Sequence, residues 1–363
     1  MKMMNPNNPF RDSRIAKGLV KAIIDEANGK NYKIMEICGT HTMSIARNGL
    51  RSILPENIEL VSGPGCPVCV TSQGEIDLFF DVIDKGATVV TFGDLLKIPN
   101  SKGRSLSTLR AEGADVRVIY SPLDTLEMAK NEPDKNFVFL GVGFETTAPT
   151  IAYLAKVAKE KGYKNVSVLS VCKTMPEAIR VILSDNDLKL DGFLCPGHVT
   201  TVTGISLYND IIDAKKAAVV AGFEPVEMLD AILEIIKQVN SKDFHVSNKY
   251  KRVVNKDGNP IARAILDEVF KPVTVSWRGI GALENSGLDF RDEYADFDAK
   301  KVYNITYNHV DEIKGCKCGA VLTGKIKPTD CKLFGTKCNT ENPIGPCMVS
   351  SEGTCAAYYR FIS

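Results

Sequence analysis

The sequence lacks three features that would place it in familiar classes of protein. It has no charge excess, since 45 Lys and Arg residues stand against 44 Asp and Glu residues, and this balance gives no electrostatic case for binding nucleic acid. No apolar run reaches the roughly 18 to 20 residues that a membrane-spanning helix needs. Residues 1–12 are polar and rich in Asn and Pro, unlike a signal peptide. These absences predict a cytoplasmic protein with no nucleic-acid or membrane partner.

Cysteine, by contrast, occurs 11 times, an odd number that does not suit a fully paired disulfide framework. In a large chain without an export signal, clustered cysteines more often indicate metal or redox chemistry than structural disulfides. The length predicts two or three domains of ordinary globular composition, with 44% hydrophobic and 25% charged residues. The cysteines are therefore the first candidates for a functional site.

Short β-branched apolar runs alternate with helical stretches along the first two thirds of the chain. This alternation is typical of βαβ units and mainly parallel sheets. We expect two similar α/β domains, at residues 1–130 and 131–243, and a loop-rich C-terminal iron–sulfur domain at residues 244–363. The polar stretch 131–135 marks the division, 241–257 is expected to be a linker, and the second domain could be a duplicate of the first. The expected strands are 33–38, 58–62, 87–92, 116–121, 136–141, 166–172, 191–195 and 217–221, and the expected helices include 14–28, 149–161 and 225–239.

Six of the cysteines lie close together in residues 316–355. Thiolate sulfur is a soft ligand that selects iron–sulfur clusters, zinc or Cu(I). A zinc site usually has two short Cys-x2–4-Cys knuckles, and their absence disfavours a zinc ribbon. An iron–sulfur cluster is the favoured interpretation, with zinc and unliganded thiols as the alternatives.

A [4Fe-4S] cluster takes four cysteine ligands. Cys331 and Cys338 are the first choices because they lie in the turn-rich stretch KPTDCKLFGTKC, and Cys355 is the third. The remaining ligand is Cys316 or Cys318, and the spacing alone does not decide between them. Cys347 is expected to be a bystander, a small buried hydrophobic residue.

Cys38 and His41 lie in the sequence CGTHT, at the end of an expected strand and directly before a helical stretch. Ligands of α/β proteins bind at the carboxyl ends of parallel strands, and a helix N-terminus would stabilise the thiolate of Cys38. His41 is a candidate metal ligand or proton carrier. Each residue also has a simpler explanation, Cys38 as a buried thiol and His41 as a side chain bonded to backbone.

Cys66 and Cys69 form a Cys-x-x-Cys motif after the next expected strand. The spacing allows the two sulfurs to form a disulfide or to hold one metal ion. Gly63 and Gly65 would form a tight turn that lets the backbone approach a ligand closely. Thioredoxin-like redox chemistry and iron binding therefore both stay open for this pair.

Two further motifs at strand ends supply candidate residues. The Gly-rich turn 141–149 carries Glu145 but completes neither G-x-G-x-x-G nor a P-loop. We therefore expect Glu145 to make a structural or partner contact at the cleft rather than to bind a nucleotide. His198 lies in CPGH, which echoes the CGTH that ends at His41, and a structural hydrogen bond is its simpler explanation.

Five segments that span nearly the whole chain form a specific set. They are MEICGTHT (35–42), SGPGCPVCVT (62–71), GVGFETTAP (141–149), CPGHV (195–199) and the tail KPTDCKLFGTKC (327–338) with NPIGPCMVSSEGTC (342–355). In this order they resemble the motifs of the HypD family of hydrogenase maturation factors. Each motif by itself is modest support, whereas the ordered set is highly specific.

The resemblance implies an assembly scaffold with redox activity rather than a conventional turnover enzyme. In this family the scaffold forms with a small HypC-type partner, and the Fe(CN)2CO unit of [NiFe]-hydrogenases is assembled on it with cyanide from a HypE-type protein. The resemblance places the iron-binding cysteine on Cys38 and the redox pair on Cys66 and Cys69. It places the [4Fe-4S] ligands on the C-terminal cysteines. Electrons would pass from the cluster through the cysteine pair to the iron.

Two other functions use the same residues. A cluster-dependent disulfide reductase would need Cys66, Cys69 and the cluster but no iron at Cys38. A zinc-stabilised binding module would have no redox role. Metal content, together with the presence of bound CN and CO, separates both from an assembly scaffold.

Overall fold

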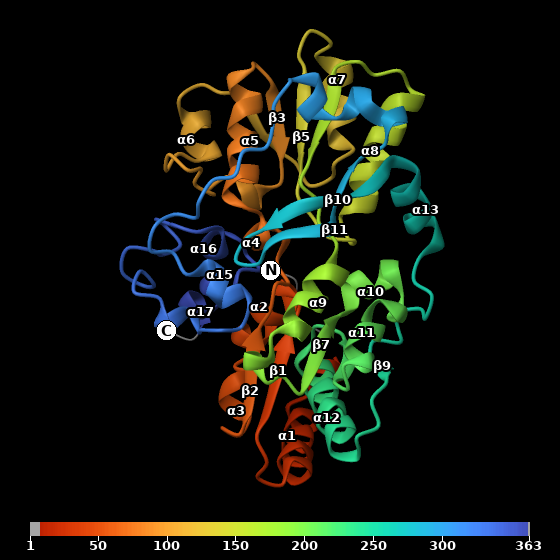
Figure 1. The fold of residues 1–363 in the computed structure, drawn as a ribbon, viewed down its shortest axis with the longest axis vertical. Coiled ribbons are helices and arrows are strands. Elements are labelled where there is room, and N and C mark those ends of the chain that lie inside the picture. Colours follow the sequence, from red (N-terminus) through yellow and green to blue (C-terminus); the bar gives the residue numbers. More distant parts are fainter. Residues whose placement is uncertain (1–7, 362–363) are drawn as a thin grey trace.

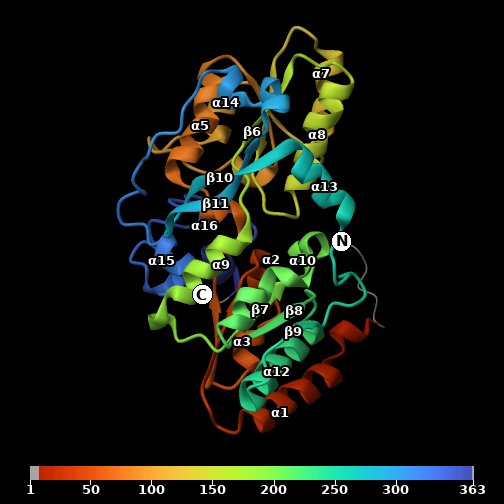
Figure 2. The ribbon, with the colours of Figure 1, turned by 45° about the vertical axis from the view of Figure 1, so that its right-hand side comes forward.

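The computed structural model describes residues 8–361, which form two α/β lobes and a smaller cysteine-rich part (Figure 1). The two lobes lie end to end along the longest axis of the molecule. The cysteine-rich part, which contains the last three helices, lies beside the junction between the lobes in both ribbon views (Figures 1 and 2). The mixed α/β architecture with parallel sheets that the sequence predicted is confirmed.

The first lobe is built on a five-stranded parallel sheet with the order β2-β1-β7-β8-β9. Helices α1 and α12 pack against each other below this sheet in Figure 2. Strands β7 and β8 are buried at every residue, as expected for parallel strands covered on both faces. The elements are β1 (Tyr32–Glu36), β2 (Ile58–Ser62), β7 (Gly192–Pro196), β8 (Ala217–Ala221), β9 (Val246–Asn248), α1 (Ser13–Ala27) and α12 (Pro225–Ser241).

The second lobe is built on a four-stranded parallel sheet with the order β4-β3-β5-β6. Helix α5 begins at a capping box in which Ser72 and Glu75 satisfy each other's backbone N–H groups. The elements are β3 (Thr88–Thr91), β4 (Val116–Val118), β5 (Phe137–Gly141), β6 (Val166–Ser170), α5 (Gln73–Asp84), α6 (Leu106–Ala111), α7 (Asp124–Asn131) and α8 (Ala148–Glu160).

The strand order differs from the consecutive arrangement that a division at residue 131 predicts. The chain leaves the first lobe after β2, builds all four strands of the second lobe and then returns for β7. Apolar patterns report that a strand is buried but not which strand it pairs with, so the pattern located the strands without assigning them to lobes. The echoing motifs CGTH and CPGH follow neighbouring strands of one sheet, which does not fit a duplication of consecutive domains.

A long antiparallel hairpin, unexpected from the sequence, lies at the junction of the lobes (Figure 1). It consists of β10 (Phe270–Trp277) and β11 (Gly281–Phe290), with an irregular register between Val273 and Val275. Trp277 at the end of β10 forms a β-bridge with Thr71, just after the Cys-x-x-Cys motif. Strand β9 also differs from expectation, because it lies in the stretch expected to be a linker.

The remaining elements are short. No helix among residues 8–361 is long and apolar enough to cross a bilayer. The α-helices are α2 (Gly39–Arg47), α3 (Leu50–Ile53), α4 (Pro67–Val70), α9 (Met175–Ser184), α10 (Gly197–Thr203), α11 (Asn209–Asp213), α13 (Pro260–Val269), α14 (Ala299–Val302), α15 (Cys318–Leu322), α16 (Pro346–Val349) and α17 (Thr354–Phe361). The 3-10 helices are η1 (Pro9–Arg11), η2 (Gly93–Leu95), η3 (Asn186–Leu188), η4 (Ile205–Tyr208), η5 (Asp292–Phe297) and η6 (Pro328–Asp330).

Candidate functional site

The site begins where the neighbouring strands β1 and β2 end. Because these strands are parallel, the loops that follow them leave the sheet at the same edge. The N–H of Gly39 donates a hydrogen bond of 2.8 Å to the carbonyl of Gly65. A Cβ on Gly65 would lie 2.2 Å from the backbone nitrogen of Cys38. The Gly-Pro-Gly turn therefore holds the Cys-x-x-Cys loop directly against the backbone at Cys38.

Cys38 is the N-cap residue of α2 and is buried. Burial, with the nearby carboxylate of Glu352, raises the pKa of its thiol to about 12. The N–H groups of Thr40 and His41 at the helix N-terminus oppose this rise, as the sequence suggested, but they do not overcome the loss of solvent. The helix N-terminus thus acts in the expected direction, but burial outweighs it and favours the neutral thiol of Cys38.

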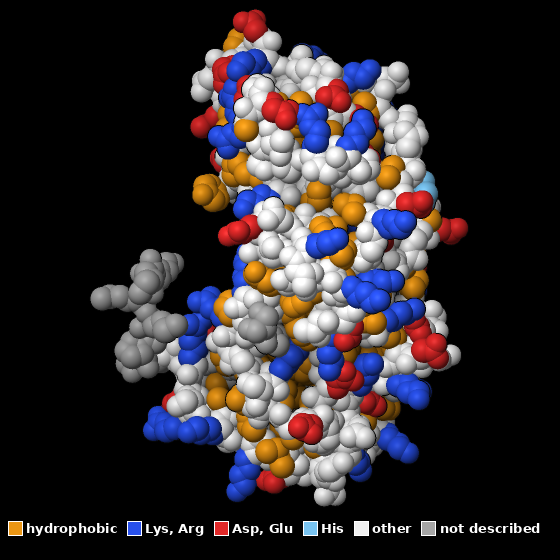
Figure 3. Space-filling view, turned by 90° about the vertical axis from the view of Figure 1, so that its left-hand side faces the viewer, with side chains coloured by type: hydrophobic (Ala, Val, Ile, Leu, Met, Phe, Trp, Pro, Cys, Tyr) orange, Lys and Arg blue, Asp and Glu red, His pale blue; other side chains and the backbone are white. Residues whose placement is uncertain are grey.

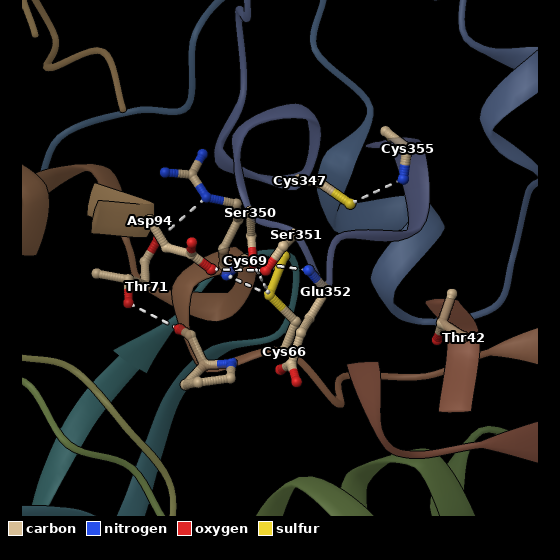
Figure 4. Close-up of a disulfide and its surroundings, with 12 residues drawn as sticks. Thr42, Cys66, Cys69, Thr71, Asp94, Cys347, Ser350, Ser351, Glu352 and Cys355 are labelled. Atoms are coloured by element: carbon tan, nitrogen blue, oxygen red, sulfur yellow. Dashed lines mark hydrogen bonds between the residues drawn. A yellow bond between two sulfur atoms is a disulfide. The ribbon is translucent and has the colours of Figure 1, made fainter. Parts of the chain in front are cut away.

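Cys66 and Cys69 form a disulfide in this structure (Figure 4). In this state neither sulfur is a thiolate, so the pair does not offer the metal ligands that the sequence left open. The Cys69 N–H donates to the Cys66 sulfur over 3.2 Å, at the start of α4. The Cys66 sulfur is buried and lies 3.4 Å from the hydroxyl oxygen of Ser350.

Ser350 belongs to residues 347–355, a segment that contacts both the Cys66–Cys69 disulfide and the loop at Cys38 (Figure 4). This segment is named the bridging segment below. The N–H of Glu352 donates to the Ser350 hydroxyl over 3.2 Å. The Glu352 carboxylate in turn accepts a hydrogen bond from the Thr40 hydroxyl, and a Cβ on Gly39 would lie 2.6 Å from the Glu352 Cβ. The bridging segment thus contacts the disulfide at Ser350 and the Cys38 loop at Glu352.

The C-terminal cysteines line one small cavity, named the cysteine cavity below. Its walls include all five candidate cluster ligands and five apolar side chains. The cysteines are Cys316, Cys318, Cys331, Cys338 and Cys355, and the apolar residues are Val321, Leu333, Phe334, Ile344 and Met348. Cys316 and Cys331 are partly exposed, whereas the other three cysteines are buried. The cavity therefore reaches the surface near Cys316 and Cys331.

Cys347, expected to be a bystander, lies among the candidate ligands. Its sulfur and those of Cys318 and Cys355 all lie within 4.8 Å of one another. Cys347 is fully buried, and its sulfur accepts a hydrogen bond of 3.3 Å from the N–H of Cys355. These three buried thiols form a group that could hold a metal ion. The spacing of the cysteines along the chain does not predict that Cys347 joins this group. Cys347 reaches Cys355 because the chain turns back on itself through residues 350–353.

Arg278, which the sequence did not single out, joins the Cys-x-x-Cys loop to the hairpin. Its N–H donates to the carbonyl of Val70 over 2.8 Å, and its guanidinium donates to the Thr71 carbonyl over 3.1 Å and to Gln73 over 3.3 Å. The side chain is only 1% exposed. The next residue, Gly279, has no room for a side chain because Gly319 of α15 packs against it. The hairpin turn therefore contacts both the Cys-x-x-Cys loop and helix α15, which carries Cys318.

Glu145 is a buried carboxyl in the Gly-rich turn after β5. One of its oxygens accepts a hydrogen bond of 2.8 Å from the N–H of Met175 at the start of α9. The other oxygen has no hydrogen-bond partner within the described part of the chain. Burial raises the pKa of Glu145 to about 7. The structural contact expected for this residue is therefore present, and the carboxyl is poised between its two protonation states near neutral pH.

His41 and His198 both contact the ring of Phe223. The ring centroids are 4.8 Å apart for His41 and 3.9 Å for the stacked His198. His41 is fully buried, and its Nε2 donates to the Gly222 carbonyl over 2.9 Å, which is the backbone bond that its simpler explanation requires. Burial lowers the pKa of His41 to about 4, so the ring is neutral at pH 7. Its Nδ1 is left as an acceptor without a partner among residues 8–361.

The fold and the site define a two-lobed α/β protein that carries a Cys-x-x-Cys disulfide beside a group of buried thiols with metal-binding capacity. The model of the HypD family, described as the hydrogenase formation hypA family, matches residues 14–362. The hydrogenase maturation factor HypD of Cupriavidus necator is 43% identical over 97% of this chain and 96% of its own length. That of Rhodobacter capsulatus is 42% identical over 97% of both chains, and that of Azotobacter vinelandii is 42% identical over 97% of this chain and 95% of its own. The chain belongs to the HypD family of hydrogenase maturation factors.

The buried carboxyl of Glu145 predicts a specific pH dependence of stability. Its pKa of about 7 in the folded protein lies above the ordinary value of 4.5, so the folded state loses stability as the pH rises from about 4.5 through 7. Gln keeps the oxygen that accepts from Met175 but does not ionise. The difference in unfolding free energy between Glu145→Gln and the wild type should therefore shift in favour of the variant by roughly 2 to 3 kcal/mol as the pH rises from 5 to 8. Urea denaturation at each pH measures this difference. Glu284→Gln, which changes an exposed carboxyl, is the control. Parallel pH profiles for the wild type and Glu145→Gln would contradict the assignment.

The contacts of Arg278 predict a structural role for its guanidinium. In Arg278→Gln the Thr71 carbonyl loses its buried donor, which should cost about 2 to 4 kcal/mol of unfolding free energy. Backbone amides near the Cys-x-x-Cys motif should also exchange hydrogen faster than in the wild type. Arg263→Gln, at an exposed position of α13, is the matched control. Equal stability and equal exchange in the two variants would show that the guanidinium does not hold this loop.

Proposed function

We propose that this protein is the scaffold on which the Fe(CN)2CO unit of [NiFe]-hydrogenases is assembled together with a HypC-type partner. Membership of the HypD family supports the role in hydrogenase maturation. The observation that carries the more detailed proposal is the bridging segment, which links three thiol sites in one short stretch of chain. It contributes Cys347 and Cys355 to the cysteine group, places Ser350 against the disulfide and places Glu352 against the Cys38 loop.

Cys38 is proposed to hold the iron that is the cargo of the scaffold. One thiolate is not enough to retain an iron ion, so a cysteine of the HypC-type partner would supply a second one. Burial keeps the free Cys38 as a thiol, and iron binding must therefore displace its proton. His41, three residues along the chain, has an unpartnered Nδ1 and is proposed to relay that proton onward rather than to keep it, because its pKa is only about 4. Glu145 and His198 are proposed to assist the same step, Glu145 as a buried proton store and His198 from its exposed position.

The cysteine cavity is proposed to hold a [4Fe-4S] cluster as the resident cofactor. The donor set fits this group, because thiolates are its protein ligands and five cysteines face a cavity whose other walls are largely apolar. The proposed ligands are Cys331, Cys338, Cys355 and either Cys318 or Cys316. Cys347 is proposed to position Cys355 rather than to bind the cluster, since its sulfur already accepts a hydrogen bond from the Cys355 N–H. When bound, the cluster supplies electrons one at a time.

Cys66 and Cys69 are proposed to be the two-electron store of the scaffold. Reduction breaks the sulfur–sulfur bond, consumes two electrons and two protons, and leaves two thiols. Reoxidation returns both electrons for the transfer of cyanide from a HypE-type donor protein to the iron. The contact between Gly65 and Cys38 supports this role, because it places the pair beside the proposed iron site. These proposed partners are proteins of the maturation pathway, and the proposed location is the cytoplasm.

The assembly role predicts the behaviour of Cys38→Ala. The variant should lose the infrared bands of iron-bound CN and CO, because it lacks the iron ligand, and should keep the visible absorption of the cluster. The measurement is infrared and absorption spectroscopy on protein purified anaerobically with its small partner. Cys172→Ala, which removes another buried free thiol, is the control and should keep both signals.

Full-intensity CN and CO bands in Cys38→Ala would refute the proposed iron ligand. A wild-type protein with cluster iron but without CN and CO would instead favour the disulfide reductase. Zinc in place of iron would favour the binding module.

The position of the cysteines predicts two classes of C-terminal variant. Cys338→Ala should lose at least half of the cluster iron and sulfide, because Cys338 faces the cavity. Cys347→Ala should keep most of both, because Cys347 is not among the residues that line the cavity and its sulfur already accepts the Cys355 N–H. Iron and acid-labile sulfide are measured after anaerobic reconstitution of each variant. The reverse result, loss in Cys347→Ala and retention in Cys338→Ala, would make Cys347 a ligand with Cys318 and Cys355.

A further inference from the structure

The surface around the cysteine cavity is basic although the whole chain is nearly neutral. Residues 314–338 contain six lysines and a single acidic residue, Asp330. Two of the lysines are paired, Lys325 with Asp185 and Lys327 with Glu59. The other four are exposed and make no ion pair within the described residues. They are Lys314, Lys317, Lys332 and Lys337, and they are called the lysine rim below.

The lysine rim follows the cysteines that line the cavity. Lys317 lies between Cys316 and Cys318 and itself lines the cavity. Lys332 directly follows Cys331, and Lys337 directly precedes Cys338. Figure 3 shows Lys and Arg side chains, with some Asp and Glu side chains among them, across the middle of the face that is on the left in Figure 1, where the cysteine-rich part lies. The unpaired charges therefore surround the place where the cavity approaches the surface.

The centre of this surface is apolar and partly exposed. Leu333 and Phe334 are half-buried and line the cavity, and Cys316 and Cys331 are partly exposed beside them. The acidic groups near the rim are few. Glu312 faces Arg278 and Gly279, and Asp330 accepts the N–H of Lys327. Asp311, beside His309, and Glu341 are exposed. An apolar centre with a mainly basic rim suits a transient complex that forms by electrostatic steering.

We propose that the lysine rim is the docking surface for an acidic electron-carrier protein. This inference rests on the proposed function, in which the cysteine cavity holds the cluster. Electron transfer needs close approach, and the rim brings a carrier of opposite charge to the side where the cavity is least covered. Each docking event oxidises the carrier by one electron and reduces the protein by one. Two events, with two protons from solvent, convert the Cys66–Cys69 disulfide into two thiols.

The test uses the anaerobically purified protein and a reduced or oxidised plant-type [2Fe-2S] ferredoxin as the acidic carrier. In the variant Lys317→Gln/Lys332→Gln/Lys337→Gln, the Kd for oxidised ferredoxin at about 20 mM salt should rise about tenfold. The difference should largely vanish at about 300 mM salt, because exposed charges are then screened. The matched control is Lys17→Gln/Lys21→Gln/Lys164→Gln, which removes the same charge from exposed positions elsewhere and should bind like the wild type.

A kinetic measurement completes the test. Reduction of the protein by reduced ferredoxin should slow by a similar factor in the rim variant, whereas reduction by dithionite should be unchanged. Equal Kd values and rates for the rim and control variants would overturn the proposal. The proposal would also be overturned if the rim variant lost binding to a single-stranded polynucleotide but bound ferredoxin like the wild type. The rim would then be a nucleic-acid surface. A protein that binds ferredoxin through the rim but contains no iron and sulfide would refute the proposed cluster and leave the docking surface standing.

Discussion

The backbone contact between Gly65 and Cys38 is the constraint on which the rest of the site depends. Parallel pairing of β1 and β2 brings the two loops to one sheet edge, and the absence of a side chain at Gly65 lets their backbones touch. The Cys-x-x-Cys motif is held there from the other side by the hairpin, through Arg278 and the bridge between Thr71 and Trp277. The disulfide is thus placed by two independent elements, and its position does not depend on the short helix α4 alone.

The same packing removes the site from water, which sets the protonation of its groups. Burial favours the neutral thiol of Cys38 and the neutral ring of His41, and it moves Glu145 toward neutrality. A cation that entered this site would meet little competing solvent, and thiolate ligands would form only as their protons leave. The buried pair of Lys173 and Glu75, 2.7 Å apart, shows that the protein does bury charge where both partners are fixed. It lies under the hairpin, where Lys173 also donates to the Ser276 carbonyl.

Much of this organisation could be predicted from the sequence. Eight apolar runs correspond to strands β1 to β8, because buried parallel strands require continuous β-branched and apolar residues. The motif cysteines after β1 and β2 were assigned to strand ends, and parallel pairing does bring them together. The hairpin was missed because half-exposed residues along β10 and β11 leave no continuous apolar run. Arg278 was missed for a related reason, since a single arginine in a turn carries no periodic signal.

The sequence by itself determined the chemical groups that this protein offers: the thiol of Cys38, a Cys-x-x-Cys pair, a group of C-terminal thiols, and strands that end at the motifs. These follow from residue types and from local spacing of a few positions. Only the tertiary structure decided which strands share a sheet, that Cys347 folds back onto Cys318 and Cys355, and that Ser350 and Glu352 reach the disulfide and the Cys38 loop. Contacts between residues some 280 to 310 positions apart depend on packing of the whole chain, and no local pattern encodes them.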